Sequence, residues 1–287
     1  MDGAIREGAM GLVLGGGNPL RHIAVAYVNR TLILACVLVF VTGVRPEPLA
    51  FVPAYFFGIG EFAGPLPTMD VWRGLFGHVL VHADLLHLVA NMVALWVFGD
   101  NVEDALGHLR YLVFFFLCAV AGALTEGLLA AEPMRPLVGA SGAISGVMGA
   151  YLLLHPHAKI LLLLFFRIPV LLPASVVVGG DLAANLAMVV LPPVPGVDAD
   201  GVAWGAHLGG FIAGMLLVAP MKRRGVPLFL PPEAYPAVPF PRLQKVLVDF
   251  FPAPHARLAG GGAWQRATAA GKAVVYFSLV AVLIWTL

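Results

Sequence analysis

The sequence is poor in charged residues and in cysteine. Asp, Glu, Lys and Arg make up 11% of its 287 residues, and the formal net charge is +1. No group of Lys and Arg resembles a nucleic-acid binding patch, so nucleic acid is not expected as a partner. The two cysteines, Cys36 and Cys118, each lie within an apolar segment. They predict neither a disulfide framework nor a metal site.

Apolar residues, in contrast, are abundant. They make up 60% of the chain, and the mean hydropathy of +0.91 is outside the usual range of soluble domains. A helix needs about 20 residues to cross the hydrocarbon layer of a membrane. The pattern predicts an all-α, multi-pass membrane protein surrounded by the lipid bilayer, with six apolar segments at residues 29–44, 75–98, 109–129, 139–154, 171–191 and 201–220.

The remaining residues divide the chain into further parts. Residues 1–28 are expected to form a cytoplasmic N-terminal segment, 29–220 the membrane domain, and 221–272, rich in Pro and Gly, an irregular tail. The run 273–287 is short for a span but could insert as a seventh helix if Lys272 snorkels. Residues 99–107 are expected to form a polar turn. The apolar stretch that ends at Ile168 is not expected to be a complete span, because Arg167 and Pro169 interrupt it.

Basic residues predict the orientation. If six spans are counted, one side of the membrane holds Arg6, Arg21, Arg30, Arg110, His155, Lys159, Lys222, Arg223 and Arg224. By the positive-inside rule this side is the cytoplasm, which places the N-terminus there. We expect a bacterial-type plasma (inner) membrane.

A run of small residues around Ser141 is the first candidate site. Its flanking glycines leave the Ser141 hydroxyl uncrowded, and Gly142, Gly146 and Ala150 recur on one helical face. Such a face can pack tightly against a neighbouring helix, which is also the purely structural interpretation of the run. As a nucleophile, Ser141 would need a general base to take its proton.

The candidate base is His207, in the last apolar segment. Gly210 and Gly214 share its helical face, so this helix can lie against the small-residue face of the Ser141 helix and bring the imidazole toward the hydroxyl. The alternative is a histidine that only hydrogen-bonds a carbonyl inside the bundle.

The second apolar segment is unusually polar, because it contains His78, His82, His87 and Asn91. Such groups should face the protein interior or water. His87 and Asn91 lie one helical turn apart and could donate two hydrogen bonds to one developing oxyanion. Zinc binding is the alternative, but Asp84 is the only carboxylate nearby.

These residues together resemble the rhomboid intramembrane serine proteases. The family's nucleophile motif is similar to Gly139–Gly142, its catalytic-histidine motif to Ala206–Gly210, and its second-helix pattern to His82, His87 and Asn91. The segments Trp72-Arg73 and Phe98–Asp104 also look like the family. The resemblance covers about residues 25 to 220.

The resemblance implies a six-helix core around a water-filled cavity. Ser141 would be the nucleophile and His207 the general base, then the acid to the leaving amine. An oxyanion site would be formed by His87, Asn91 and the Ser141 backbone N–H. Supporting positions would be His82, Gly139, Gly142 and Gly210. The substrates would be transmembrane segments of other proteins, with no third triad carboxylate, no metal and no cofactor.

Two features depart from the family pattern. Ser145 stands where some members have an aromatic residue that supports the histidine ring, so other contacts would orient His207. Asp181 and Asn185, four residues apart, lie in the span that helps to form the lateral substrate gate in the family. We expect Asp181 to affect substrate entry more than chemistry.

Two other functions fit parts of the pattern. The first is a catalytically inactive rhomboid-like protein that binds membrane clients, and the presence of both Ser141 and His207 argues against it. The second is a small transporter, which would favour paired acidic residues and repeated halves, and the sequence has no internal repeat.

Overall fold

The computed structural model describes residues 11–16, 18–59, 69–130, 132–164, 168–191 and 202–235. Most of the N-terminal segment before residue 18, the tail beyond residue 235 and the predicted seventh span, 273–287, lie outside the described residues.

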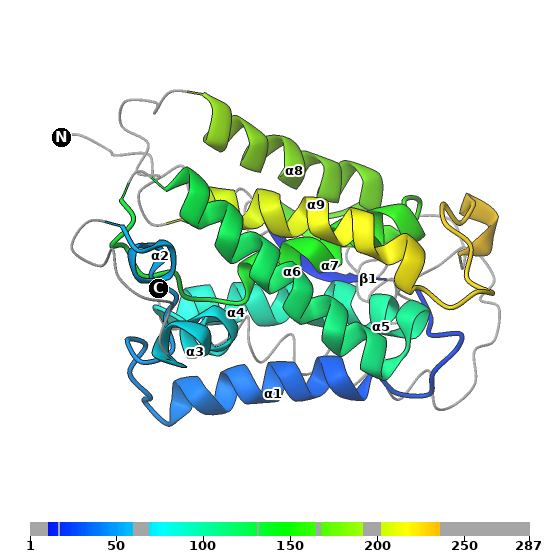
Figure 1. The fold of residues 1–287 in the computed structure, drawn as a ribbon. Helices are drawn as coiled ribbons and strands as arrows, with labels where there is room; N and C mark the ends of the chain where they lie inside the picture. The colour runs from blue at the N-terminus through cyan, green and yellow to red at the C-terminus, as the bar shows by residue number, and fades with distance from the viewer. Residues whose placement is uncertain are drawn as a thin grey trace.

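The described chain is mostly helical (Figure 1). Three of the described helices are long and apolar enough to cross a membrane. They are a continuous helix made of α4 (Leu85–Ala94), the π-helical η3 (Leu95–Gly99) and α5 (Asp100–Leu106), then α6 (His108–Leu129) and α9 (Trp204–Met221). Three shorter apolar helices are α1 (Tyr27–Val41), α7 (Ser141–Leu154) and α8 (Ala174–Val190). A mostly helical fold with candidate membrane helices is thus confirmed, while the count of six spans stays a prediction.

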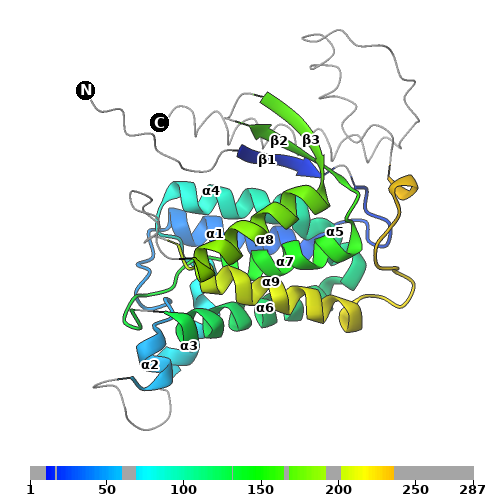
Figure 2. The same cartoon turned by 90° about the horizontal axis from the view of Figure 1, so that it is seen from above.

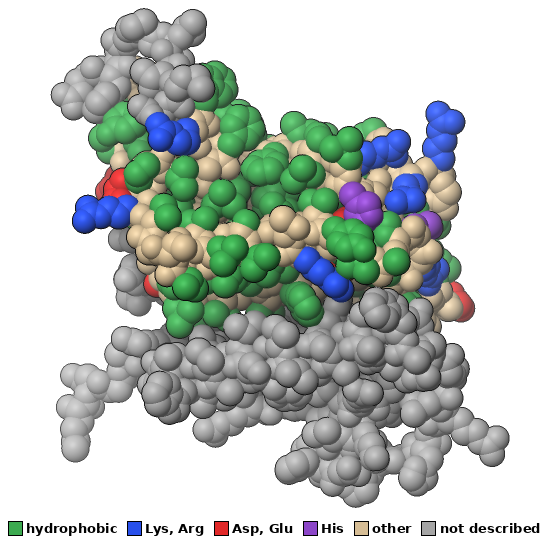
Figure 3. Space-filling model, turned by 90° about the horizontal axis from the view of Figure 1, so that it is seen from below, with side chains coloured by type: hydrophobic (Ala, Val, Ile, Leu, Met, Phe, Trp, Pro, Cys, Tyr) green, Lys and Arg blue, Asp and Glu red, His purple; other side chains and the backbone are tan. Residues whose placement is uncertain are grey.

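The outer surface of these helices suits lipid. Leu38 of α1, Leu117 of α6 and Leu216 of α9 are exposed large hydrophobic side chains. In Figure 3, hydrophobic side chains cover most of the middle of the described surface, and Lys and Arg lie mainly towards its two ends. Apolar side chains between charged ends are what a bilayer requires of a spanning protein.

Helices α7 and α9 pack backbone to backbone, beside α6 (Figures 1 and 2). A Cβ atom at Gly210 would overlap the carbonyl oxygen of Gly142, and a Cβ atom at Gly214 would overlap that of Gly146. Only glycine permits this approach, as in other small-residue interfaces between membrane helices. The contact sets the N-terminal turns of α7 and α9 side by side.

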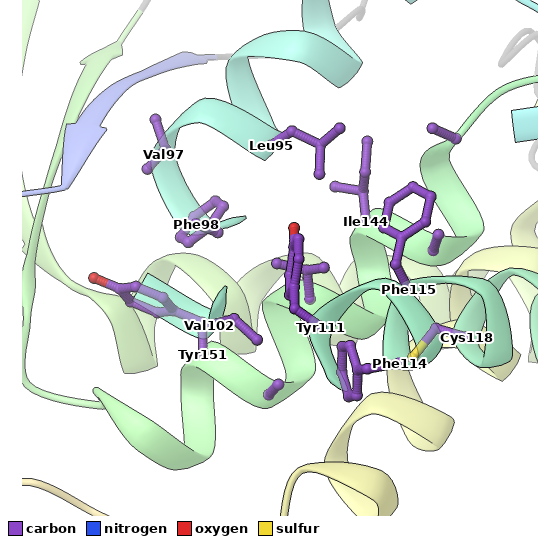
Figure 4. Close-up of a cluster of buried hydrophobic side chains, with 14 of the residues drawn as sticks. Leu95, Val97, Phe98, Val102, Tyr111, Phe114, Phe115, Cys118, Ile144 and Tyr151 are labelled. Atoms are coloured by element: carbon purple, nitrogen blue, oxygen red, sulfur yellow. The ribbon is translucent and has the colours of Figure 1, made fainter. Parts of the chain in front are cut away.

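A hydrophobic core lies between α5, α6, η3 and α7 (Figure 4). Its largest fully buried side chains include Tyr111, Tyr151, Phe98 and Phe114. The rings of Phe98 and Tyr151 meet edge to face with centroids 5.1 Å apart, the geometry that aromatic pairs prefer. This core fixes the helices whose ends carry the polar residues described below.

A three-stranded antiparallel sheet lies along one flank of the helices (Figure 2). Its strands are β1 (Gly11–Gly16), the central β2 (Lys159–Leu164) and β3 (Ile168–Pro173), with Lys159 paired to Pro173 and Leu164 to Gly11. The all-α prediction is therefore wrong. The apolar stretch that ends at Ile168 forms strands, and β3 tolerates its two prolines because it is an edge strand.

The predicted boundaries of the second span are also wrong. Residues 75–98 are split between α3 (Met69–Gly77), the 3-10 turn η2 (His78–Leu80), α4 and η3, with an irregular stretch at residues 81–84. Asp84 ends this stretch by capping α4, because its side chain accepts a hydrogen bond from the His87 N–H at 2.8 Å. Two short helices complete the described chain, α2 (Pro53–Phe57) and the 3-10 turn η4 (Pro232–Ala234).

Residues 99–107, predicted as a polar turn, mostly form helix α5. The Asp104 carboxylate accepts hydrogen bonds from the backbone N–H groups of Arg21, His22 and Ile23 at 2.6–3.0 Å. Glu103 does the same for the N–H groups at the start of α1. Buried carboxylates need such donors, so the polar residues of α5 hold the segment before α1 in place.

Candidate active site

Ser141, His207, His87 and Asn91 line one cavity of about 1000 Å³. Five charged side chains also line this cavity: Asp84, Glu126, Glu132, Arg135 and Asp181. Charged groups in a protein that spans a membrane need water or partners. The volume is enough for many water molecules at about 30 Å³ each, so the cavity can hold both water and part of a substrate.

Ser141 is the first residue of α7. Gly139, two residues earlier, has a φ of +106°, in the region that favours glycine, and its N–H donates to the His78 carbonyl at 2.9 Å. A Cβ atom at Gly139 would stand 2.5 Å from Nε2 of His87. The His87 ring therefore lies directly against the backbone that leads into Ser141.

His87 and Asn91 occupy successive turns of α4. The Asn91 Nδ2 donates to the His87 carbonyl oxygen at 2.7 Å, which uses one of the two amide hydrogens and leaves the other for the cavity. His82 is buried behind this pair, with its ring 5.1 Å from that of His87. Within the described chain neither ring nitrogen of His82 has a partner.

His207 lies in the first turn of α9, where two features hold the backbone. The glycine contact of Gly210 with Gly142 sets α9 against α7. The Glu126 carboxylate of α6 accepts a hydrogen bond from the Ala206 N–H at 3.1 Å, and so it caps α9, whose own N-cap residue provides no side-chain acceptor. Three helices thus determine where the imidazole lies.

The His207 ring is held by contacts that the sequence did not predict. Nδ1 of His207 lies 2.8 Å from Oδ1 of Asn185 on α8. The Trp204 ring meets the imidazole edge to face, with the two ring centroids 5.9 Å apart. Among the described residues, the hydrogen bond of the ring goes to Asn185 rather than to Ser141. Catalytic hydrogen bonds often form only when substrate binds, so a His207 ring bonded to Asn185 is compatible with a Ser–His pair.

Two residues near the site, Trp204 and Glu126, were missed, and the contact of Asn185 with His207 was not foreseen, although each of the three left a signal in the sequence. Asn185 shares a helical face with Asp181 in an apolar segment, Trp204 precedes His207 by nearly one turn, and Glu126 is a lone carboxylate in an apolar segment. The structure places Asp181 on the cavity wall, while its part in substrate entry stays a prediction. Within the described chain, no three His, Cys, Asp or Glu side chains form a group that could hold a metal ion.

Comparison with known proteins agrees with the resemblance. The model of the Rhomboid domain matches residues 68–224. The chain is 36% identical over 153 residues to Rhomboid protein 1, mitochondrial, of Saccharomyces cerevisiae. This match covers 50% of this chain and 40% of that protein. It is 28% identical over 174 residues to Rhomboid-related protein 2 of Mus musculus, covering 61% and 52% respectively.

A bacterial relative carries the word protease in its name. The chain is 31% identical to Rhomboid protease GluP of Bacillus subtilis over 93 residues, 32% of this chain and 18% of that protein. The matches thus span between about a fifth and about half of these relatives. Mitochondrial proteins are among them, so the bacterial type of membrane stays a prediction. The Rhomboid domain match covers more than half of the chain, and the chain is therefore an integral membrane protein that belongs to the rhomboid family.

Proposed function

We propose that the protein is an intramembrane serine endopeptidase that cleaves transmembrane segments of other membrane proteins. The observation that supports this most is the common cavity of Ser141, His207, His87 and Asn91. Each of these residues is of the type that peptide hydrolysis needs: a hydroxyl nucleophile, an imidazole base and two hydrogen-bond donors.

In the proposed reaction, Nε2 of His207 takes the proton of the Ser141 hydroxyl while Oγ of Ser141 attacks the scissile carbonyl carbon. The carbonyl oxygen becomes an oxyanion, which the His87 ring, the free amide hydrogen of Asn91 and the Ser141 backbone N–H stabilise. His207 then protonates the leaving amine. Water from the cavity hydrolyses the acyl-enzyme by the same transfers in reverse.

The proposed protease domain comprises residues 29–220 with six spans, and its N-terminus is cytoplasmic. His82, Gly139, Gly142 and Gly210 support the site without taking part in proton transfer. The glycines allow the close contacts already described. In this proposal the chain itself supplies every group that the reaction needs, and no cofactor is required.

The test is cleavage of a model single-span substrate by the purified protein in lipid vesicles. Wild type is compared with Ser141→Ala and His207→Ala, and Ser145→Ala serves as the matched control, because Ser145 lines the same cavity one turn later. We expect both active-site variants to lose cleavage and labelling by a fluorophosphonate, with the control close to wild type.

The opposite result is equally informative. If wild type is folded but neither cuts several permissive substrates nor reacts with the fluorophosphonate, a client-binding rhomboid without catalysis becomes the better explanation. If Ser145→Ala rather than Ser141→Ala abolishes labelling, the nucleophile is assigned to the wrong serine.

A further inference from the structure

Asn185 is buried at a place where α8 buries little else. Helix α8 has three buried residues, Ala174, Val178 and Asn185, and Asn185 is 4% exposed. A buried amide in a membrane protein needs partners for its donors and its acceptor. Its partners are two residues that line the proposed active-site cavity, His207 and Asp181.

The contacts of Asn185 fix which way its amide points. Nδ2 lies 2.8 Å from the Asp181 carbonyl oxygen and 3.1 Å from the Asp181 Oδ2. A carbonyl oxygen and a carboxylate oxygen accept hydrogen bonds, so the atom facing them must be the NH₂ group. The amide oxygen Oδ1 is then the atom that faces His207.

This orientation in turn fixes the proton on the His207 ring. An amide oxygen only accepts hydrogen bonds, so the Nδ1 atom 2.8 Å away must carry a hydrogen. In a neutral imidazole with Nδ1–H, the lone pair is on Nε2. That is the nitrogen needed to take the proton of Ser141.

We propose that Asn185 is a positioning residue for His207, holding the ring in its Nδ1–H form, and that Asp181 orients the Asn185 amide. This inference deepens the proposed protease function and depends on it for its catalytic consequence. The chain lacks an aromatic residue at position 145 to support the histidine, and Asn185 with the Trp204 ring takes that place.

The first test separates rate from binding. Asn185→Leu keeps a similar side-chain volume but removes the acceptor, and Leu186→Ala changes a neighbouring exposed side chain of α8 as the matched control. We expect Asn185→Leu to lower kcat roughly 10- to 100-fold with KM nearly unchanged, less than the roughly 100- to 10,000-fold that a positioned general base contributes, because the base itself remains. The control should keep wild-type kcat. A kcat equal to that of the control would overturn the proposal.

The second test reads the tautomer directly. In ¹⁵N NMR of protein labelled at histidine, the His207 signal is identified as the one lost in His207→Ala. We expect a protonated Nδ1 in wild type and a shift of the proton to Nε2 in Asn185→Leu, a change that loss of packing alone does not produce. An unchanged tautomer in Asn185→Leu would refute the positioning role.

A double substitution tests the part of Asp181. Asp181→Asn together with Asn185→Asp exchanges the donor and the acceptor but keeps both hydrogen bonds possible, so we expect the Nδ1–H signal to return. Asp181→Asn alone leaves an acceptor for the amide but removes its charge and is expected to have the smaller effect. If the double variant behaves like Asn185→Leu, the hydrogen bond between the side chains at 181 and 185 does not help to position His207.

The NMR readout also keeps the two proposals apart. A wild type that shows Nδ1–H but neither cuts nor is labelled would refute the protease function and leave the Asn185–His207 contact in place. A wild type that cuts normally with the proton on Nε2 would refute the positioning role and leave the protease function standing.

Discussion

Replacing Glu103 by Gln tests how the start of α1 is held. The Glu103 side chain is fully buried, and it accepts hydrogen bonds from the N–H groups of Val28 at 3.1 Å and Asn29 at 2.7 Å. These N–H groups lie in the first turn of α1, where Ala26, the N-cap residue, offers no side-chain acceptor. Nδ1 of His108 lies 2.5 Å from the same carboxylate.

The expected loss can be worked out from these contacts. Glu103→Gln keeps one acceptor oxygen but turns the other position into a donor that faces a backbone N–H. A hydrogen bond to a charged group contributes about 1.5–3 kcal/mol, and a carboxylate at a helix N-terminus up to about 2 kcal/mol. The two estimates overlap because they describe the same atoms, but the new donor leaves a buried N–H unpaired, which adds about 1 kcal/mol. We therefore expect a loss of about 2–4 kcal/mol in the free energy of unfolding.

The assay is thermal unfolding of the full chain in detergent micelles, followed by circular dichroism. At roughly 2–4 °C per kcal/mol for a domain of this size, Tm should fall by roughly 5–15 °C. Glu47→Gln is the matched control, because Glu47 is exposed in the loop after α1. A Tm decrease for Glu103→Gln no larger than that of Glu47→Gln would refute the role of Glu103 as the cap of α1.

Two further predictions concern packing and pH. Gly210→Ala forces a Cβ onto the Gly142 carbonyl oxygen and should lower the free energy of unfolding by about 1–3 kcal/mol. Gly180→Ala, on α8 with open space around it, should raise it by about 0.5–1 kcal/mol. Equal Tm shifts of the two variants in micelles would contradict this. Burial lowers the pKa of His155, just beyond α7, from 6.5 to about 4. As the pH is lowered, the unfolded chain therefore binds this proton before the folded chain does. The free energy of unfolding should decrease as the pH is lowered from 6.5 to about 4, by up to about 1.4 kcal/mol per pH unit. His155→Gln should lose this part of the pH dependence, and the control His157→Gln, at an exposed position, should keep it. If the Tm of His155→Gln changed with pH as that of wild type does, His155 would not be the group responsible.

The cavity residues could be predicted because their chemistry is unusual for their surroundings. A histidine or asparagine in an apolar segment costs free energy unless it faces water or a partner, so His87, Asn91 and His207 stand out without any structure. Helical periodicity then gives the faces of Ser141 and His207, and the glycines show that these faces can approach each other. The roles of these residues in catalysis stay predictions until cleavage is measured.

The anchoring of the N-terminal segment could not be predicted in the same way. In sequence, Asp104 and Glu103 belong to a short polar stretch, and such stretches are most often exposed turns. Their hydrogen-bond donors are backbone N–H groups 74 to 83 residues earlier in the chain, and a backbone N–H has no signature in a sequence. The strands β2 and β3 were missed for a related reason, since a short apolar run fits a strand or a partial helix equally well.

The contact of Asn185 with His207 has a mechanical consequence for α8. Most of α8 buries little apolar surface against the other helices, and in lipid apolar contacts between helices give little net attraction in any case. One interhelical hydrogen bond in a membrane contributes only about 0.6–2 kcal/mol, so α8 is held near His207 by a weak and specific contact. A displacement of this half of α8 by more than about 1 Å away from α9 would break the bond from Nδ1 of His207, because its acceptor Oδ1 is on α8. If His207 is the base, as proposed, the position of α8 and the orientation of its ring are coupled by the free energy of that single hydrogen bond.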